Sequence, residues 1–511
     1  GGASPLDPRI DLDATGEYEI SRPTLEPWDR EMHLAALDAS YDLGFATLSS
    51  TTSYGETEGF LVNDSTVNLL GTAYGVYYTS APANPRTIIP STHSDNDETF
   101  TQEVRLVSSS GEAIEYTVGA FFQRQQRQIG LSVWAPGADT YSAAAYGGST
   151  LPIVIGGAYV PLFEDSSSYN QDTKQTFKDY SLFGEVTWSP TDRLHLTGGA
   201  RAFHQSFEQR LKSASSFFYF EIDALNEFEA DSQIFKLNSS YELDDENRLY
   251  ATWSQGYRRG GANAFAMAGA VAEPAALLEY DADTTDNFEF GAKGTILGLN
   301  YSADVFYILW DSPQIDLYTP YLLTPVVVNG EEAESKGFEF EISGPVGPEG
   351  LNVSFGLAYA KARLTKDFAL PSGDGAGGVV PGAISGSDGD RLPGSPDWSG
   401  ALNVSYTTEL DAIGDVTYSF GATGRSSSYD ALPNPVYNTR ETPGYIMLNG
   451  SILVDRGDWQ VEIFATNLLD KRATYSQPAR TDSSLSRTGA WGNQYLVSRP
   501  REVGVRLTRN F

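Results

Sequence analysis

The chain ends in Val503-Gly504-Val505-Arg506-Leu507-Thr508-Arg509-Asn510-Phe511. Apolar residues stand at positions 503, 505, 507 and 511, with small or polar residues between them. A period of two places an apolar row and a polar row on opposite faces of a β-strand. Such a strand with a final aromatic residue is typical of an outer-membrane barrel, where a lipid-facing row alternates with a wet inner row. The alternative is the last strand of a soluble β protein.

Length and composition narrow the class of protein. The 511 residues include 50 glycines, 29 tyrosines and 26 phenylalanines, which favour strands, turns and aromatic girdles over helices. The most apolar stretch, Leu151–Phe163, is broken by prolines and glycines, so no membrane helix is predicted. The absence of cysteine excludes disulfides and thiolate metal sites. The net charge of −33 argues against attraction to nucleic acid or to anionic lipid.

Alternating segments predict 17 strands, arranged as hairpins with tight turns and separated by longer connections. Most of the segments are near or above the roughly 9–11 residues that a tilted strand needs to cross a bilayer. The predicted strands are His33–Asp42, Phe45–Gly55, Thr99–Ser108, Ile114–Gln126, Phe177–Trp188, Leu194–Gln209, Gln233–Leu243, Arg248–Arg258, Asp286–Ile296, Asn300–Trp310, Ser335–Ser343, Leu351–Leu364, Trp398–Thr408, Val416–Ser427, Tyr445–Val454, Trp459–Ala465 and Leu496–Phe511.

The connections between hairpins are long, which counts against a compact soluble domain. They are Phe60–Glu98, Arg127–Thr176, Leu211–Asp231, Gly260–Tyr280, Tyr318–Ala333, Asp367–Pro396 and Gln477–Gln494. Alternation of tight turns with long loops is what a bacterial barrel shows, with turns in the periplasm and loops outside the cell. The sequence therefore predicts an all-β fold, a transmembrane antiparallel β-barrel. Since an odd strand count is unusual in such barrels, residues 1–32 are interpreted as the remnant of an extracellular loop and residues 33–511 as the barrel.

Two segments fix the predicted faces of the strands. In Tyr301–Tyr307 the odd positions form an apolar row for lipid, and Asp304 falls on the row that faces the lumen. In Lys336–Ile342 the phenylalanines and Ile342 point one way, and Glu339 and Glu341 the other. A carboxylate facing lipid is costly, so this alternation sets the register.

Several short stretches, taken in order, resemble the C-terminal part of TonB-dependent outer-membrane receptors. They are Phe100–Leu106, Val118–Phe122, Leu182–Glu185 followed by Leu196–Arg201, Gln255–Gly261, Glu334–Glu339, Ala465–Asp470 and the terminal strand. The resemblance covers nearly the whole chain from about His33. It implies a barrel of 22 strands, of which this chain holds about 17. About five strands and the N-terminal plug with its TonB box are then expected to be absent from the sequence.

The resemblance also implies a function. Receptors of this family take up scarce nutrients across the bacterial outer membrane, powered by the TonB-ExbB-ExbD complex acting through the plug. A ferric siderophore is the first ligand expected; carbohydrate, plant-derived aromatic compounds and cobalamin stay open. A passive porin without a plug, and an adhesin or assembly barrel, are the alternatives. The expected partners are a small-molecule ligand, the TonB complex and outer-membrane lipid.

No pattern in the sequence predicts catalysis. Four histidines are present, but neither a nucleophile elbow nor an H-E-x-x-H motif accompanies them. Asp95–Glu98 and Asp388–Asp390 have oxygen ligands that calcium would accept, but their spacing does not match an EF-hand, and solvated charge runs are favoured. We predict no catalytic residue, no resident metal and no cofactor.

Aromatic and basic residues in or beside the long loops are the candidates for ligand binding. Aromatic faces with a few polar groups suit planar or sugar-like ligands. Arg258 and Arg259 could hold carboxylates or an anionic chelate. The predicted ligand-binding residues are Trp134, Tyr141, Tyr257, Arg258, Arg259, Trp310 and Tyr318. The alternative is that these aromatic residues form a girdle and pack the loops.

Overall fold

The computed structural model describes residues 25–65, 89–134, 167–215, 220–264, 273–319, 325–373, 378–433, 441–476 and 496–510. Within them, 17 strands form one antiparallel sheet, which confirms the predicted fold class. The strands are β1 (Trp28–Asp42), β2 (Ala46–Asp64), β3 (Pro90–Ser108), β4 (Ile114–Trp134), β5 (Ser167–Thr191), β6 (Leu194–Ser215), β7 (Phe220–Glu242), β8 (Arg248–Arg258), β11 (Asp283–Ile296), β12 (Leu299–Asp311), β15 (Glu332–Pro345), β16 (Leu351–Leu364), β19 (Trp398–Leu410), β20 (Gly414–Arg425), β23 (Tyr445–Asp455), β24 (Trp459–Thr466) and β27 (Glu502–Arg509).

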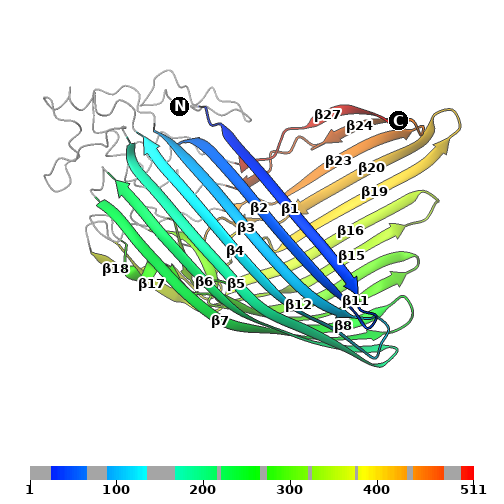
Figure 1. Ribbon diagram of the computed structural model, residues 1–511. Helices are drawn as coiled ribbons and strands as arrows, with labels where there is room; N and C mark the ends of the chain where they lie inside the picture. Colours follow the sequence, from blue (N-terminus) through cyan, green and yellow to red (C-terminus); the bar gives the residue numbers. More distant parts are fainter. Residues whose placement is uncertain are drawn as a thin grey trace, which may run out of the picture.

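In the order just given, each strand of the sheet pairs with the next one. Figure 1 shows the sheet curving round, with β1 and β27 as its two edges. In the described residues β1 pairs with β2 alone, and β27 with β24 alone. The expectation of about five further strands stays a prediction.

Smaller elements occupy the connections at the loop end of the sheet. β9 (Gly261–Ala262) pairs with β10 (Glu279–Tyr280), and the 3-10 helix η2 (Ala275–Leu277) lies between them in sequence. The other two-stranded pairs are β13 (Gln314–Tyr318) with β14 (Pro325–Asn329), β17 (Phe368–Gly373) with β18 (Val379–Gly386), β21 (Ser428–Tyr429) with β22 (Glu441–Thr442), and β25 (Thr474–Ser476) with β26 (Leu496–Val497).

Several predicted boundaries are wrong. Most of the connection predicted over Leu211–Asp231 is strand, because β6 continues to Ser215 and β7 begins at Phe220. In this part of β7 the charged residues occupy the outward positions and most of the apolar residues the inward ones. The outward apolar row therefore disappears where the strand leaves the lipid. The first strand begins at Trp28, five residues before the predicted His33. The last strand begins at Glu502, since Leu496–Val497 pairs with β25 instead. Phe511 lies outside the described residues.

Exposure of the side chains supports the predicted faces. In β12, Val305, Tyr307 and Leu309 are 55%, 38% and 43% exposed, as expected for a row that contacts lipid. Asp304 lies opposite Glu339 on β15 and belongs to the other face. The main buried apolar cluster is not between two sheets. It lies at the loop end, where η2, β13, β14, β17 and the end of β16 bring Leu277, Ile315, Val326, Val328, Leu364 and Phe368 together. Among the described residues, no helix is long and apolar enough to cross a bilayer.

The face assignment predicts the effect of charge on the outer wall. We expect Val305→Arg to lower the free energy of unfolding by about 2–4 kcal/mol, because it places a guanidinium in the hydrocarbon layer. Ser302→Arg is the matched control, since Ser302 shares a face with Glu341, its partner on β15. Urea titration of the protein refolded into vesicles measures both. Equal destabilisation by the two substitutions would contradict the assigned faces.

Candidate ligand-binding site

Arg258 is the centre of a polar network at the loop end of the sheet. It ends β8, and Asp283 lies directly opposite it at the start of β11. The Arg258 guanidinium Nε donates to both carboxylate oxygens of Asp283, at 3.2 and 3.1 Å, and Nη2 makes a closer contact with Oδ2. Asp283 is only 3% exposed. A charge-assisted pair in this fork geometry is among the stronger polar contacts in a protein, so the Arg258 charge is already matched.

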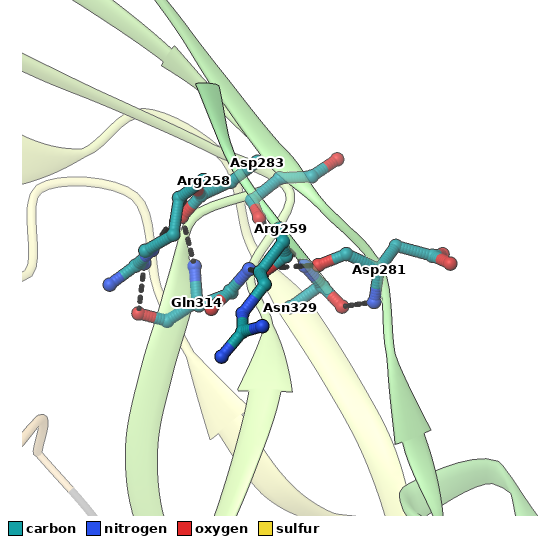
Figure 2. A network of polar contacts seen from close by, with 7 residues as sticks. Arg258, Arg259, Asp281, Asp283, Gln314 and Asn329 are labelled. Atoms are coloured by element: carbon teal, nitrogen blue, oxygen red, sulfur yellow. Dashed lines mark hydrogen bonds and ion pairs between the residues drawn. The ribbon is translucent and has the colours of Figure 1, made fainter. Parts of the chain in front are cut away.

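The same network ties the β13–β14 hairpin to the sheet. Gln314, the first residue of β13, donates its backbone N–H to Asp283 Oδ2 at 3.0 Å and accepts from Arg258 Nη2 at 3.1 Å through its carbonyl oxygen. Its side-chain Nε2 donates to the carbonyl oxygens of Arg259 (2.8 Å) and Asp281 (3.1 Å). Asn329 accepts the Asp281 backbone N–H at 2.7 Å (Figure 2). Arg258 therefore has a positioning role for this hairpin.

Arg259, the next residue, is in a different environment. Its guanidinium carbon lies 3.8 Å from the ring centroid of Phe177 and 5.8 Å from that of Phe207. Nη1 is buried and has no hydrogen-bond partner among the described residues. Figure 2 shows the side chain pointing away from the network around Arg258. Burial lowers the pKa of Arg259, and nearby Tyr280 and Asp97 oppose this shift through their charge. In the described residues the close contacts of this cation are with aromatic faces.

The aromatic surface under Arg259 comes from the pairing of β5 with β6. Phe177 and Phe207 are directly opposite each other in register and are 8% and 6% exposed. Phe203, four residues before Phe207 and on the same face of β6, has its ring centroid 4.6 Å from that of Tyr257. Burial also raises the pKa of the Tyr280 phenol. Tyr257, Arg259 and Tyr280 therefore gather over the inner face of β5 and β6.

Carboxylates near this surface are occupied by other groups. Asp97 on β3 accepts hydrogen bonds from Gln125 Nε2 (2.6 Å) and from Thr99 Oγ1 (2.9 Å). Asp179 on β5 accepts from Gln205 Nε2 at 2.6 Å. Asp179 Oδ1 also lies 3.6 Å from Arg201 Nη2. In the described residues no ion pair joins Asp97 or Asp179 to Arg259. The site presents one positive charge, aromatic faces and polar groups around them.

The predicted site residues fall into three groups. Tyr257, Arg258, Arg259 and Trp310 lie together, and the Arg258 guanidinium carbon is 5.5 Å from the Trp310 ring centroid. Trp310 also packs against the apolar cluster of the loop layer. Trp134 ends β4, and Tyr318 ends β13, but the Tyr318 side chain is outside the described part. Tyr141 lies outside the described residues. Their roles as ligand contacts remain predictions.

Sequence reasoning missed Asp283, Gln314, Phe177 and Phe207. The sequence pattern predicts that this strand begins at Asp286, which places Asp283 in a connection, whereas Asp283 is the first residue of β11. Phe177 was placed in a strand, but its face was not assigned. The period of two in β5, with Tyr180 and Leu182 exposed and Phe177 and Asp179 buried, would have placed it on the inner face.

The curved antiparallel sheet with a layer of long loops at one end defines an outer-membrane receptor barrel. Residues 2–468 match the family described as "TonB dependent receptor-like, beta-barrel". The chain belongs to this family of outer-membrane receptors, whose members are transporters and not enzymes.

The individual relatives and solved structures match this chain at low sequence identity. The pesticin receptors of Yersinia pestis and Yersinia enterocolitica are each 26% identical over 243 residues, which cover 46% of this chain and 34% of the relative. Among solved structures, the ferric yersiniabactin uptake receptor FyuA from Yersinia pestis superposes with a TM-score of 0.71 at 15% identity, covering 95% of this chain and 62% of FyuA. The siderophore receptor PiuA from Acinetobacter baumannii gives 0.66 at 16% identity, covering 94% and 64%. These structural likenesses concern the fold, and the chain spans less than two thirds of each relative.

The network around Asp283 predicts a local loss of order. In Arg258→Gln the buried Asp283 carboxylate loses its cation, and we expect destabilisation of about 3–5 kcal/mol. We expect amide hydrogen exchange to speed up in β13 and β14 before it does in β8. Mass spectrometry of exchanged peptides measures this. Arg456→Gln, at a tight turn where Arg456 donates to the Ala412 carbonyl oxygen, is the control. Unchanged exchange in the hairpin would show that Arg258 does not position it.

Proposed function

We propose that this chain forms the barrel of a TonB-dependent receptor that takes up an anionic ligand, with a ferric siderophore as the first candidate. The observation that carries the proposal is Arg259: its Nη1 is buried without a hydrogen-bond partner, and no described carboxylate forms an ion pair with it. The TonB-ExbB-ExbD complex is the expected energy source. The relatives named above are described as receptors for pesticin, ferric yersiniabactin or siderophores, which is consistent with this class of ligand.

A partly buried cation without an anion is energetically unfavourable in the empty receptor. A ligand that brings a carboxylate or another oxyanion removes that cost and gains a charge-assisted hydrogen bond. The rings of Phe177 and Phe207 hold the guanidinium on one side, which leaves its edge for a planar oxyanion. A neutral sugar would use the aromatic faces but gain nothing from the charge. The site therefore favours an anionic chelate over carbohydrate.

This proposal predicts a charge-dependent loss of binding. We expect Arg259→Gln to weaken the binding of carboxylate-bearing ferric siderophores by about 10- to 100-fold, the loss of one hydrogen bond to a charged group. Arg259→Lys should recover part of the loss, because it keeps the charge without the fork. Tryptophan fluorescence quenching on the purified protein, with a panel of anionic and neutral ferric chelates, measures the affinities. Equal binding of anionic chelates by the unchanged protein and Arg259→Gln would rule out this role.

Transport itself needs a separate test. Uptake of radioactive iron by cells should require both the protein and TonB, because the family couples transport to the inner membrane. Uptake that continues in cells without TonB, together with large conductance steps in planar bilayers, would support the passive porin. Loss of all solute binding with retained cell adhesion would support an adhesin. These outcomes are distinguishable from a wrong assignment of Arg259, which affects ligand choice alone.

A further inference from the structure

Beyond the lipid, β7 has a free edge. β6 pairs with β7 over Phe220–Tyr241 without a register shift, whereas β8 pairs only with Lys236–Glu242. Apart from β6, no described strand pairs with Glu221–Gln233. The continuous apolar outward row of β7 ends at the same place, with Leu237 and Phe235 at 57% and 40% exposure. The edge is therefore free only where water can hydrogen bond the backbone.

The hydrogen bonds at the end of β7 show which backbone groups lie on this edge. The Glu242 N–H donates to the Arg193 carbonyl oxygen, on the β6 side, at 2.8 Å. The Leu243 N–H donates to the Asn247 carbonyl oxygen, on the β8 side, also at 2.8 Å. In an antiparallel sheet the N–H and C=O of one residue point to the same neighbour, and successive residues alternate. The odd-numbered residues of Asp223–Gln233 therefore direct both groups to the free edge.

The side chains along this edge form an outward acidic row and an inward row that is mostly apolar. Exposure alternates with a period of two over this part of β7. The outward row is Glu221, Asp223, Leu225, Glu227, Glu229, Asp231 and Gln233, and the inward row is Ile222, Ala224, Asn226, Phe228, Ala230 and Ser232. The residues with free backbone groups are thus the same ones that carry the acids.

β6 neutralises part of the acidic row. Arg210 Nη2 and Lys212 Nζ lie 2.8 and 4.0 Å from Asp223 Oδ2. His204 Nδ1 lies 2.9 Å from Asp231 Oδ1. These contacts cover the two ends of the row and leave its centre.

The remaining acids have no cation beside them. Glu208 on β6 lies opposite Glu227 and adds a further carboxylate. Lys174 and Lys178 belong to β5, two strands from β7, at about 9–10 Å for the usual strand spacing. That distance is about one Debye length at physiological salt. In the described residues no ion pair involves Glu221, Glu227 or Glu229. The outward side of the β7 edge is therefore net negative.

A free edge of this length can pair with a further strand. Bulges and prolines commonly protect such edges, but β7 has neither a bulge against β6 nor a proline. The acidic row would repel the same row of a second copy, because opposed like charges destabilise an antiparallel pair. It would also repel an anionic lipid. A strand with basic side chains on its outward face matches both the backbone groups and the carboxylates.

We propose that the β7 edge, Glu221–Gln233, binds an extended segment of another protein by strand addition, and that this segment alternates basic and apolar residues. In antiparallel pairing, a residue opposite an odd-numbered residue of β7 exchanges both backbone hydrogen bonds with it and shares its outward face. Basic side chains then lie beside Glu227 and Glu229, and apolar ones beside Phe228. Main-chain hydrogen bonds supply affinity, and the alternating side chains supply specificity. This surface is separate from Arg259 and does not rest on the proposed ligand.

Synthetic peptides test the pairing. The probe is a fluorescent peptide of alternating lysine and valine, about 11 residues long and so about 37 Å when extended. Its binding to the purified full chain is measured by fluorescence anisotropy. Antiparallel pairing uses the lysine N–H groups, while the valine N–H groups point away from β7. We expect N-methylation of the lysines to weaken binding at least about tenfold, and N-methylation of the valines to change it less than about twofold.

A proline variant tests the edge from the side of the protein. Leu225→Pro removes an N–H that faces the free edge and keeps the hydrogen bonds to β6, since proline is tolerated in this position of an edge strand. We expect the variant to fold, as shown by its migration in unheated gels, and to bind the peptide at least about tenfold more weakly. Unchanged binding by the folded variant would overturn the proposal.

Charge variants test the acidic row. We expect about tenfold weaker binding after removal of three exposed ion pairs, in the triple variant Glu221→Gln, Glu227→Gln, Glu229→Gln. The matched control removes the same charge from the outward rows of β2 and β3, which are paired on both sides there, and should bind as the unchanged protein does: Glu56→Gln, Glu58→Gln, Glu98→Gln. Equal loss in the two triple variants would contradict binding at β7. Equal binding of the two N-methylated peptides would show attraction by charge alone and not strand addition.

Discussion

The constraint on which this structure depends is that a backbone group in hydrocarbon must be hydrogen bonded to another backbone group. A wide antiparallel sheet meets it for the strands between its two edges, because each of them pairs with a neighbour on both sides. Once the backbone is fixed in this way, side chains alternate between lipid and lumen, and the outer row must be apolar. β5 shows the result, with Tyr180 and Leu182 exposed and Phe177 and Asp179 buried. Recognition is then left to the inner face, the loop layer and the two borders of the membrane.

Sequence reasoning could recover whatever follows directly from that alternation. The strand number, the chain order of the hairpins and the class of fold are confirmed. It could not recover the strand parts that lie in water beyond the lipid, or the elements that form through tertiary contacts. β6 and β7 extend beyond the lipid, where the outward row can be charged, so Leu211–Asp231 lacks the outward apolar row that marks a membrane strand. The hairpin β13–β14 forms because Val326 and Val328 pack with Ile315 and Leu317, a partnership that spacing along the chain does not reveal.

Net charge was the least informative of the sequence properties. A value of −33 averages over both faces of the sheet, the loops and the turns. Register resolves what the average hides, because it shows that Arg124, Lys178, Lys174 and Arg210 lie in two opposed pairs on the outer face. The same register puts Asp95 and Arg127 on the inner face, where they neutralise each other at 2.7 Å.

Arg258 and Arg259 show how far a motif alone can define a site. As sequence they are two identical cations at the end of one strand, and both are reasonable partners for an anionic ligand. The difference comes from Asp283, 25 positions after Arg258, which the β8–β11 pairing brings opposite Arg258 and not opposite Arg259. One guanidinium is thereby committed to holding β13 in place through Gln314. The other is left on the faces of Phe177 and Phe207, two residues that meet because β5 pairs with β6. Strand register therefore decides which of the two arginines has a carboxylate partner, and it leaves Arg259 as the one with the charge that the proposed ligand contact requires.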